Sequence, residues 1–416
     1  MTAPKVTYLL KKFPRLSETF ILNELLALQG QGLELSVLSR REPDDEPRHP
    51  ELAGLGAPVD VLPSWRSLDP WSLLFGADVE LREALATRLP GVLASFGAFG
   101  HPRMPSLLAE AVYLFGRCRE QGVRHLHVHF ATDAAVVACL LEALGGPGYS
   151  LTLHAKDIYR ETVDPALLAR LVGNSRFSVT VCDANVRHIT QLLGEAAARR
   201  LRRHYNGIDV SALSDAPTHP GARDAEHILA VGRLVPKKGF SYLLEAMSQL
   251  LPRRPGLRLT LVGDGDDRPA LEARSAELGL SSVVTFTGAR DQGEVRKLLS
   301  HATLMALPCV VAEDGNRDAL PTVLLEALAA GLPVVSTPVT GIPEIVDDGR
   351  AGRLVPERDV AGLARALDEL LSDADERGRL ARAGRQRARQ LFNMHSNASV
   401  LAEWFRHAVP ERAAVC

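Results

Sequence analysis

The sequence predicts an α/β protein built from two doubly wound parallel sheets, and three observations support this fold class. Short apolar runs alternate with helix-length segments in both halves of the chain, a pattern typical of parallel sheets with right-handed crossovers. A chain of 416 residues is too long for one ordinary hydrophobic core. Residues 211–224, SALSDAPTHPGARD, are rich in Pro, Gly and polar residues, and the alternation restarts directly after them. We therefore expect two Rossmann-like domains that face a central cleft.

The domain boundaries follow from the same pattern. We expect an N-terminal domain over residues 1–212, a linker over 213–224 and a C-terminal domain over 225–393. The last segment, 394–416, contains the helical run NASVLAEWFRHAV.

Composition narrows the class of protein. Hydrophobic residues make up 46% and charged residues 24%, which is typical of a soluble globular chain. The net charge of −2 gives no general attraction to nucleic acid or bulk membrane. The five cysteines are scattered and lack CxxC spacing, which favours a reducing compartment and argues against structural zinc. No signal peptide and no apolar stretch of about 18 residues is found, so we expect a cytoplasmic location.

The N-terminal half opens with a β-α-β unit. Strands are expected at residues 6–10 and 33–38, with a helix that starts near Thr19 and has Ser17 as its N-cap. Ser17, Glu18 and Thr19 thus lie where the first strand meets the first helix, and ligands of doubly wound sheets collect at the carboxyl ends of strands. A simple helix cap is the alternative reading. Residues 40–60 are expected to form a charged surface loop.

Histidines mark two later strand ends. The run HLHVHF, residues 125–130, puts three histidines on one strand face, which could bind a metal, but no fourth ligand is spaced nearby. An ordinary parallel strand is therefore favoured, with His129 near its end. A second apolar strand ends in His154, followed by Lys156 and Asp157, where an α/β sheet presents its site residues. A purely structural histidine is the alternative.

The C-terminal half repeats strand and loop with charged or glycine-rich strand ends. The strand in HILAVGRL ends in Gly232 and Arg233, and the loop PKKG contains Lys238. The turn VGDG contains Gly265, and VVTFTGAR ends in Arg290. TLMALPC and GLPVVST are further strands, and GIPEIVDDG is expected to be a turn.

The stretch DALPTVLLEALAAG, Asp318 to Gly331, is the most informative. Glu326 lies in a run that is apolar on all sides, and such helices are normally buried. A buried carboxylate is costly unless it has partners, and a helix start near Pro321 offers free N–H groups to an anion. These features fit a nucleoside diphosphate with its ribose. The alternative is that Glu326 pairs with a core arginine.

In their order along the chain, these motifs resemble those of a known family. GRLVPKKG, VGDG, FTGAR, the acid–seven residues–acid stretch and GIPEIV occur as in retaining glycosyltransferases of the GT-B fold. The chain resembles the family 4, or group 1, glycosyltransferases over nearly its whole length. FPRLSETFI, TLHAKDIY, YNGID and AEDGNRDALPTVLLEALAAGLPVVST are similar to the bacterial exopolysaccharide branch, which is of the colanic-acid type.

The resemblance implies transfer of a hexose, with retained configuration, from a UDP- or GDP-sugar to a hydroxyl of a saccharide, lipid-linked or secondary-metabolite acceptor. No metal or other cofactor is implied. It implies that Arg233 and Lys238 bind the donor diphosphate and that Glu326 binds the ribose. The N–H groups of Leu320 and Thr322 would complete the phosphate site, to which Gly265 also belongs. Arg290 would border the base. It also implies that the terminal helix crosses back onto the N-terminal domain.

For the transferred sugar, the resemblance implies that His154 lies beside the hexose and that Asp318 contacts it. Ser17, Glu18, Thr19 and Asp157 would belong to the N-domain loop that closes over donor and acceptor. Asp318 is one methylene shorter than the family's usual glutamate, and Leu-Pro replaces the frequent Phe-Gly, so the hexose stays open.

Two other functions remain as alternatives. One is a GT-B relative that acts as a sugar phosphorylase or epimerase, although no lysine context demands pyridoxal phosphate or an inorganic phosphate pocket. The other is a non-catalytic subunit that binds sugar nucleotides. Peripheral membrane association fits a lipid-linked acceptor.

Overall fold

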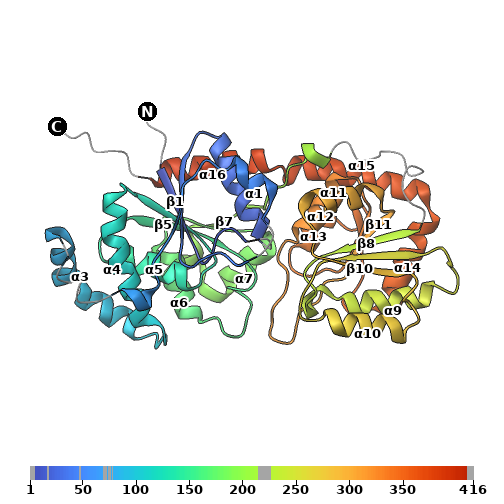
Figure 1. The fold of residues 1–416 in the computed structure, drawn as a ribbon, viewed down its shortest axis with the longest axis horizontal. Helices are drawn as coiled ribbons and strands as arrows, with labels where there is room; N and C mark the ends of the chain where they lie inside the picture. The colour runs from blue at the N-terminus through green and yellow to red at the C-terminus, as the bar shows by residue number, and fades with distance from the viewer. Residues whose placement is uncertain are drawn as a thin grey trace. The chain divides into compact units, whose positions relative to one another are not determined.

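Two parallel sheets organise the computed structural model, which describes residues 5–15, 18–45, 48–68, 73, 76, 78–213 and 226–409. The expected α/β class with two doubly wound parallel sheets is confirmed (Figure 1). Contacts divide the chain into two compact units. Unit 1 takes the chain up to Val181, then Val186–His204 and the chain from Ala398; unit 2 takes Cys182–Asn185 and Tyr205–Asn397.

Unit 1 contains a seven-stranded sheet in the order β3-β2-β1-β4-β5-β6-β7, with parallel pairing throughout. Its strands are β1 (Lys5–Leu10), β2 (Glu34–Ser39), β3 (Val59–Val61), β4 (His125–His129), β5 (Gly148–Leu153), β6 (Ser178–Thr180) and β7 (Leu201–Arg203). The strand order reverses between β1 and β4. This is the topological switch point, the place where open α/β sheets bind ligands.

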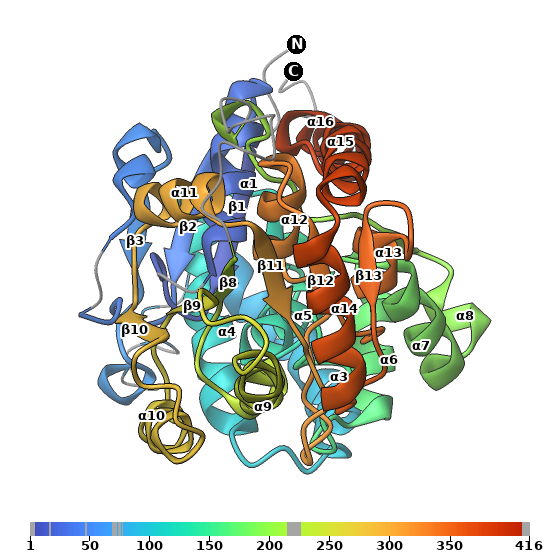
Figure 2. The same ribbon diagram turned by 90° about the vertical axis from the view of Figure 1, so that its right-hand side faces the viewer.

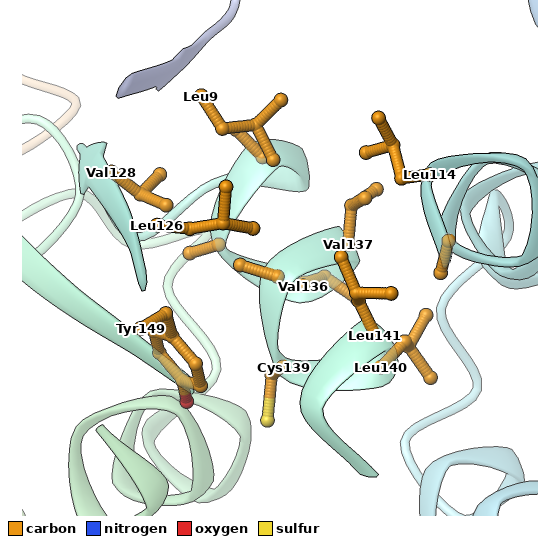
Figure 3. Packing of buried hydrophobic residues seen from close by; sticks show 14 of the residues in the cluster. Leu9, Leu114, Leu126, Val128, Val136, Val137, Cys139, Leu140, Leu141 and Tyr149 are labelled. Atoms are coloured by element: carbon orange, nitrogen blue, oxygen red, sulfur yellow. The ribbon is translucent and has the colours of Figure 1, made fainter. Parts of the chain in front are cut away.

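The core of unit 1 is centred on α5. The helices of this unit are α1 (Thr19–Gly30), α3 (Val79–Gly97), α4 (Met104–Glu120), α5 (Asp133–Ala143), α6 (Pro165–Asn174), α7 (Asp183–Leu193) and the short α8 (Glu195–Ala198). Figure 3 shows Val136, Val137 and Leu141 of α5 among strand residues such as Leu126, all of them buried. A helix that is apolar all round suits this position between a sheet and other helices.

Unit 2 contains a six-stranded parallel sheet in the order β10-β9-β8-β11-β12-β13. Its strands are β8 (His227–Val231), β9 (Arg258–Val262), β10 (Val284–Gly288), β11 (Leu304–Leu307), β12 (Val334–Ser336) and β13 (Gly352–Leu354). This order repeats the reversal of unit 1, so its switch point lies between β8 and β11.

The helices of unit 2 cover both faces of its sheet. They are α9 (Phe240–Leu250), α10 (Arg268–Glu277), α11 (Gln292–His301), α12 (Thr322–Ala329), α13 (Ile342–Val346), α14 (Val360–Ser372) and α15 (Ala374–Leu391). α9 packs against α10 and α14 on one face, and α12 packs against α11, α13 and α15 on the other (Figures 1 and 2). Helices on both faces explain why the central strands β8 and β11 are buried along nearly their whole length.

The terminal helix, α16 (Met394–Ala408), packs on unit 1 from Ala398 onward. Phe405 is fully buried, and its ring centroid lies 5.9 Å from that of His125 and 5.6 Å from that of Phe177.

Three strands and one helix differ from the expectations. β3 lies in the segment expected to be a loop, and β7 and β13 were not expected. β3 is an edge strand whose Val59 is 39% exposed, so it lacks the buried apolar run that identifies a strand. The expected turn GIPEIVDDG contains α13, because Pro343 fits the first helical turn, where its missing N–H costs nothing. Within the described residues, no helix is both long and apolar enough to cross a bilayer.

Candidate functional site

The charged residues of the candidate site in unit 2 follow the carboxyl ends of β8 and β11. Gly232 and Arg233 follow β8, and a 3-10 turn, Pro236–Lys238, comes next. Cys309 follows β11, and the chain then runs through a loop to Asp318, just before α12. Both segments therefore lie at the switch point of the sheet.

Asp318 is the centre of this cluster. Its Oδ1 lies 2.9 Å from Nζ of Lys237, and its Oδ2 lies 2.7 Å from Nζ of Lys238. The Sγ of Cys309 donates to Oδ2 at 3.4 Å. The three charged side chains are only 12 to 16% exposed. One carboxylate thus holds two ammonium groups in a largely dehydrated place.

The charges of this cluster stabilise one another. Burial by itself lowers the pKa of Lys238, but the Asp318 carboxylate outweighs it and raises that pKa above its usual value. Burial by itself raises the pKa of Asp318, but the two lysines outweigh it and hold that pKa well below its usual range. Lys238 and Asp318 are therefore both charged at neutral pH. Lys237 was missed by the sequence analysis, although the KKG run contains it.

Glycines bring the strand-end loops into close contact. A Cβ on Gly239, whose φ is +68°, would lie 1.9 Å from the carbonyl oxygen of Pro308. A Cβ on Gly265 would lie 2.3 Å from the carbonyl oxygen of Leu234. Only glycine permits such backbone approaches. Gly265 therefore fixes the β9 turn against the β8 loop, and Gly239 holds the lysine loop against the end of β11.

Two predicted arginines lie on the surface of unit 2. Arg233 is exposed, and no carboxylate among the described residues pairs with it. It lowers the pKa of Lys238 slightly by its charge, which places it near the lysine cluster. Arg290 is exposed at the end of β10, where its Nη1 lies 3.6 Å from Oε1 of Glu294. The structure thus groups Arg233 with the lysines and gives Arg290 a partner on α11.

Glu326 lies within α12 and is partly buried. Burial raises its pKa to about 7, and Arg296 offsets only part of this effect. Among the described residues, no direct ion pair or hydrogen bond to its carboxylate is found, although Arg296 is near enough for its charge to act on Glu326. The N–H groups of Leu320 and Thr322 likewise have no acceptor within the described chain.

In unit 1, His154 and Asp157 lie together after β5. The Asp157 carboxylate accepts hydrogen bonds from the backbone N–H of His154 at 3.0 Å and from that of Ala131, after β4, at 2.8 Å. Asp157 therefore fixes the ends of two neighbouring strands. Its pKa is raised to about 6 by burial.

The loop before α1 contributes Glu18 to the same region. Glu18 is the N-cap residue of α1, but its side chain bonds Nη1 of Arg15 at 2.9 Å rather than the helix backbone. Its Oε1 also lies 3.9 Å from Nζ of Lys156. Thr19 is the first helical residue and is partly exposed. Ser17 lies outside the described residues, and the structure gives the N-cap position to Glu18.

Strand β4 is buried along its whole length although it contains three histidines. His125 and His127 share the hydroxyl of Ser150, at 2.8 Å each, and His127 also contacts Thr152 at 2.9 Å. His129 instead contacts His154, with 3.1 Å between Nδ1 and Nε2. The structure thus joins the two histidines that the sequence placed at neighbouring strand ends.

Glu24 of α1 completes this cluster and was missed by the sequence analysis. Its Oε1 lies 3.0 Å from Nε2 of His129 and accepts from the Tyr8 hydroxyl at 2.7 Å. One ligand atom each of Glu24, His127 and His129 lies within 4.8 Å of the others, so these three could hold a metal ion. The signal was present, because Glu24 lies in the apolar run FILNELLAL much as Glu326 lies in its own.

Comparisons with known proteins identify the family of this chain. The family model described as glycosyl transferases group 1 matches residues 217–387. The chain is 29% identical over 405 residues to the putative colanic acid biosynthesis glycosyltransferase WcaL of Escherichia coli, with 94% of this chain and 96% of WcaL covered. It is 30% identical over 388 residues to a glycogen synthase of Mycobacterium tuberculosis, with 91% of this chain and 87% of the synthase covered.

A solved structure has the same fold. The crystal structure of Anabaena HepE in complex with UDP superposes with a TM-score of 0.73 at 18% identity. The superposition covers 97% of this chain and 100% of HepE. Two Rossmann-type sheets, a cationic switch point and a nearly full-length relative at 30% identity lead to one conclusion. This chain belongs to the glycosyl transferases group 1 and is a glycosyltransferase.

Proposed function

We propose that the chain transfers a hexose from a nucleoside diphosphate to a saccharide hydroxyl, with retained anomeric configuration and without a metal ion. The observation that carries this proposal is the convergence of Lys237 and Lys238 on Asp318, with the unpaired Arg233 after the same strand. Relatives support the substrate class, since WcaL is described as a colanic acid biosynthesis enzyme and HepE is bound to UDP.

The lysine cluster explains how the leaving group is stabilised. A diphosphate carries more negative charge than one carboxylate, so it competes for the ammonium groups that Asp318 holds. Two lysines and one arginine then neutralise the charge that develops on the departing phosphate. This preorganised positive charge supplies what a divalent cation supplies in other transferases.

When the diphosphate takes over the two lysines, the Asp318 carboxylate is released and can bind the sugar. Its carboxylate then accepts hydrogen bonds from hydroxyls of the hexose. The ribose hydroxyls donate to Glu326, and the N–H groups of Leu320 and Thr322 hold phosphate oxygens.

The transfer itself follows a front-face route. The bond between the anomeric carbon and the phosphate oxygen breaks, and the acceptor oxygen bonds to the same face of that carbon. The acceptor proton passes to the departing phosphate oxygen, so no covalent sugar–enzyme intermediate forms. We also infer a cytoplasmic reaction, because Cys118, Cys139, Cys182 and Cys309 are buried and free.

The test is a transfer assay with UDP- and GDP-hexoses, an oligosaccharide acceptor mixture and excess chelator. We expect one donor to be consumed, with NMR showing a retained anomeric configuration. Lys238→Ala should lower kcat by at least about a hundredfold, because one cation is lost from the leaving group. The matched control is Lys297→Ala, since Lys297 is an exposed lysine on α11.

Several results would overturn the proposal. Inversion of configuration, or loss of turnover on chelation that a divalent cation restores, would contradict the mechanism. Sugar phosphate formed only with added inorganic phosphate would favour a phosphorylase. Tight donor binding without transfer or hydrolysis, for any acceptor class including lipid-linked sugars and small metabolites, would favour a binding subunit.

A further inference from the structure

The loop that connects β11 with α12 in unit 2, residues 309–318, ends in Asp318. Near its start, the N–H of Val310 donates to the backbone carbonyl of Lys237 at 2.9 Å. At its end, Oδ1 of Asp318 lies 2.9 Å from Nζ of the same lysine. Lys237 therefore contacts both ends of this loop, and the position of Asp318 depends on how the loop between them is held.

Val311 of this loop is bound by two consecutive side chains that follow β13. Its N–H donates to Oε2 of Glu357 at 2.8 Å, and its carbonyl oxygen accepts from Nη2 of Arg358 at 2.6 Å. Nη1 of Arg358 also lies 3.6 Å from Oε2 of Glu357. Both backbone polar groups of one loop residue are thus bound by side chains of a distant segment, and Glu357 and Arg358 together form a clamp on Val311.

Arg358 adopts a backbone conformation that is unfavourable for its residue type. Its φ is +63°, which lies in the left-handed region where a side chain costs energy. The next residue, Asp359, caps α14, because its Oδ1 accepts from the N–H of Gly362 at 2.8 Å. Glycine makes such a turn into a helix without this cost. The bond to Val311 is what the arginine side chain adds at this position.

Residues 312–316 connect the clamp with Asp318. The N–H of Ala312 donates to the carbonyl oxygen of Asn316 at 2.9 Å, and that of Gly315 donates to the carbonyl oxygen of Ala312 at 3.0 Å. These bonds close a turn directly after Val311, so the turn moves together with it. A displacement of Val311 therefore displaces Asp318 as well.

We propose that Glu357 and Arg358 are positioning residues that, through the backbone of this loop, keep Asp318 opposite the two lysines. The effect on the donor rests on the proposed function, in which Asp318 binds the hexose after the diphosphate has taken over the lysines. A loosened loop then weakens the sugar contact. It does not weaken the diphosphate contact, because Asp318 competes with the diphosphate. The clamp thus favours the complete nucleotide sugar over the nucleoside diphosphate alone.

The first measurement is the rate at which a maleimide labels Cys309 in the full-length protein without donor, followed by mass spectrometry of each cysteine peptide. Cys309 is fully buried and its Sγ donates to Oδ2 of Asp318 at 3.4 Å, so its labelling reports displacement of the loop. Glu357→Leu should raise the rate about fivefold, because one hydrogen bond of the closed loop is lost. Glu357→Gln keeps an acceptor oxygen for Val311 and should label like the wild type.

Two further variants separate the clamp from general stability. Asp348→Ala is the matched control, because the Asp348 carboxylate also accepts from a backbone N–H of unit 2, that of Leu354 at 2.8 Å. It should leave the labelling of Cys309 unchanged. Arg358→Gly removes the other half of the clamp and relieves the positive φ. It should raise the labelling of Cys309 while the midpoint of thermal unfolding stays close to that of the wild type.

The second measurement is titration calorimetry with UDP-glucose and UDP, and with GDP-mannose and GDP as a second pair. Glu357→Leu should lower the affinity for the nucleotide sugar about tenfold and leave the affinity for the nucleoside diphosphate equal or higher. Glu357→Gln should recover most of this loss. In an Asp318→Ala background, Glu357→Leu should have no further effect, because the clamp acts through Asp318.

The outcomes separate this inference from the proposed function. Unchanged labelling of Cys309 in Glu357→Leu and Arg358→Gly, or an equal rise in Asp348→Ala, overturns the clamp. Equal losses of affinity for the nucleotide sugar and the nucleoside diphosphate, or an undiminished effect in the Asp318→Ala background, overturn its action through Asp318. A wild type that binds neither pair contradicts the proposed function, and the labelling of Cys309 still decides whether Glu357 and Arg358 hold the loop.

Discussion

Glu326 is the residue whose chemistry depends most directly on pH. Its pKa of about 7 means that the carboxylate loses its proton across the physiological range. The ionised form accepts hydrogen bonds from ribose hydroxyls, so we predict that donor affinity rises as the pH increases from 6 to 8. A hydrogen bond to a charged group contributes about 1.5–3 kcal/mol, so Glu326→Gln should weaken donor binding at least about tenfold at pH 8. Titration calorimetry at both pH values measures this.

The pH dependence of the free energy of unfolding independently tests the raised pKa of Glu326. The folded pKa of Glu326 lies above the ordinary value of 4.5, so its contribution to stability is complete below pH 4.5 and is lost as the pH rises through 7. Glu326→Gln should therefore be more stable than the wild type at pH 8, by roughly 1–3 kcal/mol, and equally stable near pH 4.5. The exposed Glu277 on α10 gives the control Glu277→Gln, which should show no such crossover. Equal donor affinity in wild type and Glu326→Gln at pH 8 would rule out the ribose role.

At the scale of the elements, the position of the lysine loop depends on a close backbone contact at Gly239. Gly239 lies between the lysine loop and α9, with a φ of +68° and no room for a Cβ beside the carbonyl of Pro308. Gly239→Ala should lower both stability and donor affinity, because the loop must shift and Lys238 moves with it. Thermal unfolding and donor titration measure the two effects.

Gly279→Ala is a close control for this change. Gly279 has a φ of +70°, but a Cβ there would meet nothing within 4 Å. Both variants carry the cost of about 1–2 kcal/mol for a side chain at positive φ, and only Gly239→Ala adds the steric conflict. If the two variants lose equal stability and both bind donor normally, the close approach at Gly239 has no part in the site.

Some elements could be predicted from the sequence, and others could not, for physical reasons. The buried parallel strand β11 is a continuous apolar run, and β4 alternates histidine with apolar residues, so both patterns are visible in the sequence. The edge strand β3 is half exposed and three residues long, so it lacks that signal. For the site, strand ends predicted Arg233 and Lys238 in unit 2 and His154 in unit 1, because parallel strands deliver such residues to one edge of each sheet. The pairing of Lys237 with Asp318 and of Glu24 with His129 joins distant segments, and sequence spacing carries no information about such contacts.

At the scale of the whole molecule, the same strand order occurs in both units, and each has charged groups at its own switch point. The family model covers residues 217–387, all of which belong to unit 2, whereas the relatives align over both units. We infer that unit 2 is the shared part of this family and that unit 1 carries more of what distinguishes its members.

The end of the chain makes unit 1 depend on residues that follow unit 2 in the sequence. Phe405 of α16 is fully buried against the rings of His127 and Phe177, with centroids 5.0 and 5.6 Å away. Phe405→Ala should therefore cost about 3–5 kcal/mol, because it removes a buried aromatic ring and leaves a cavity. Val400→Ala on the same helix, where the side chain is 44% exposed, should change stability by less than about 0.5 kcal/mol. Hydrogen exchange should show lost protection in β4 and β5 of the Phe405 variant and unchanged protection in β11 and β12. Equal loss in both sheets would mean that α16 stabilises the chain as a whole, whereas selective loss would show that unit 1 completes its fold only after unit 2 has been made.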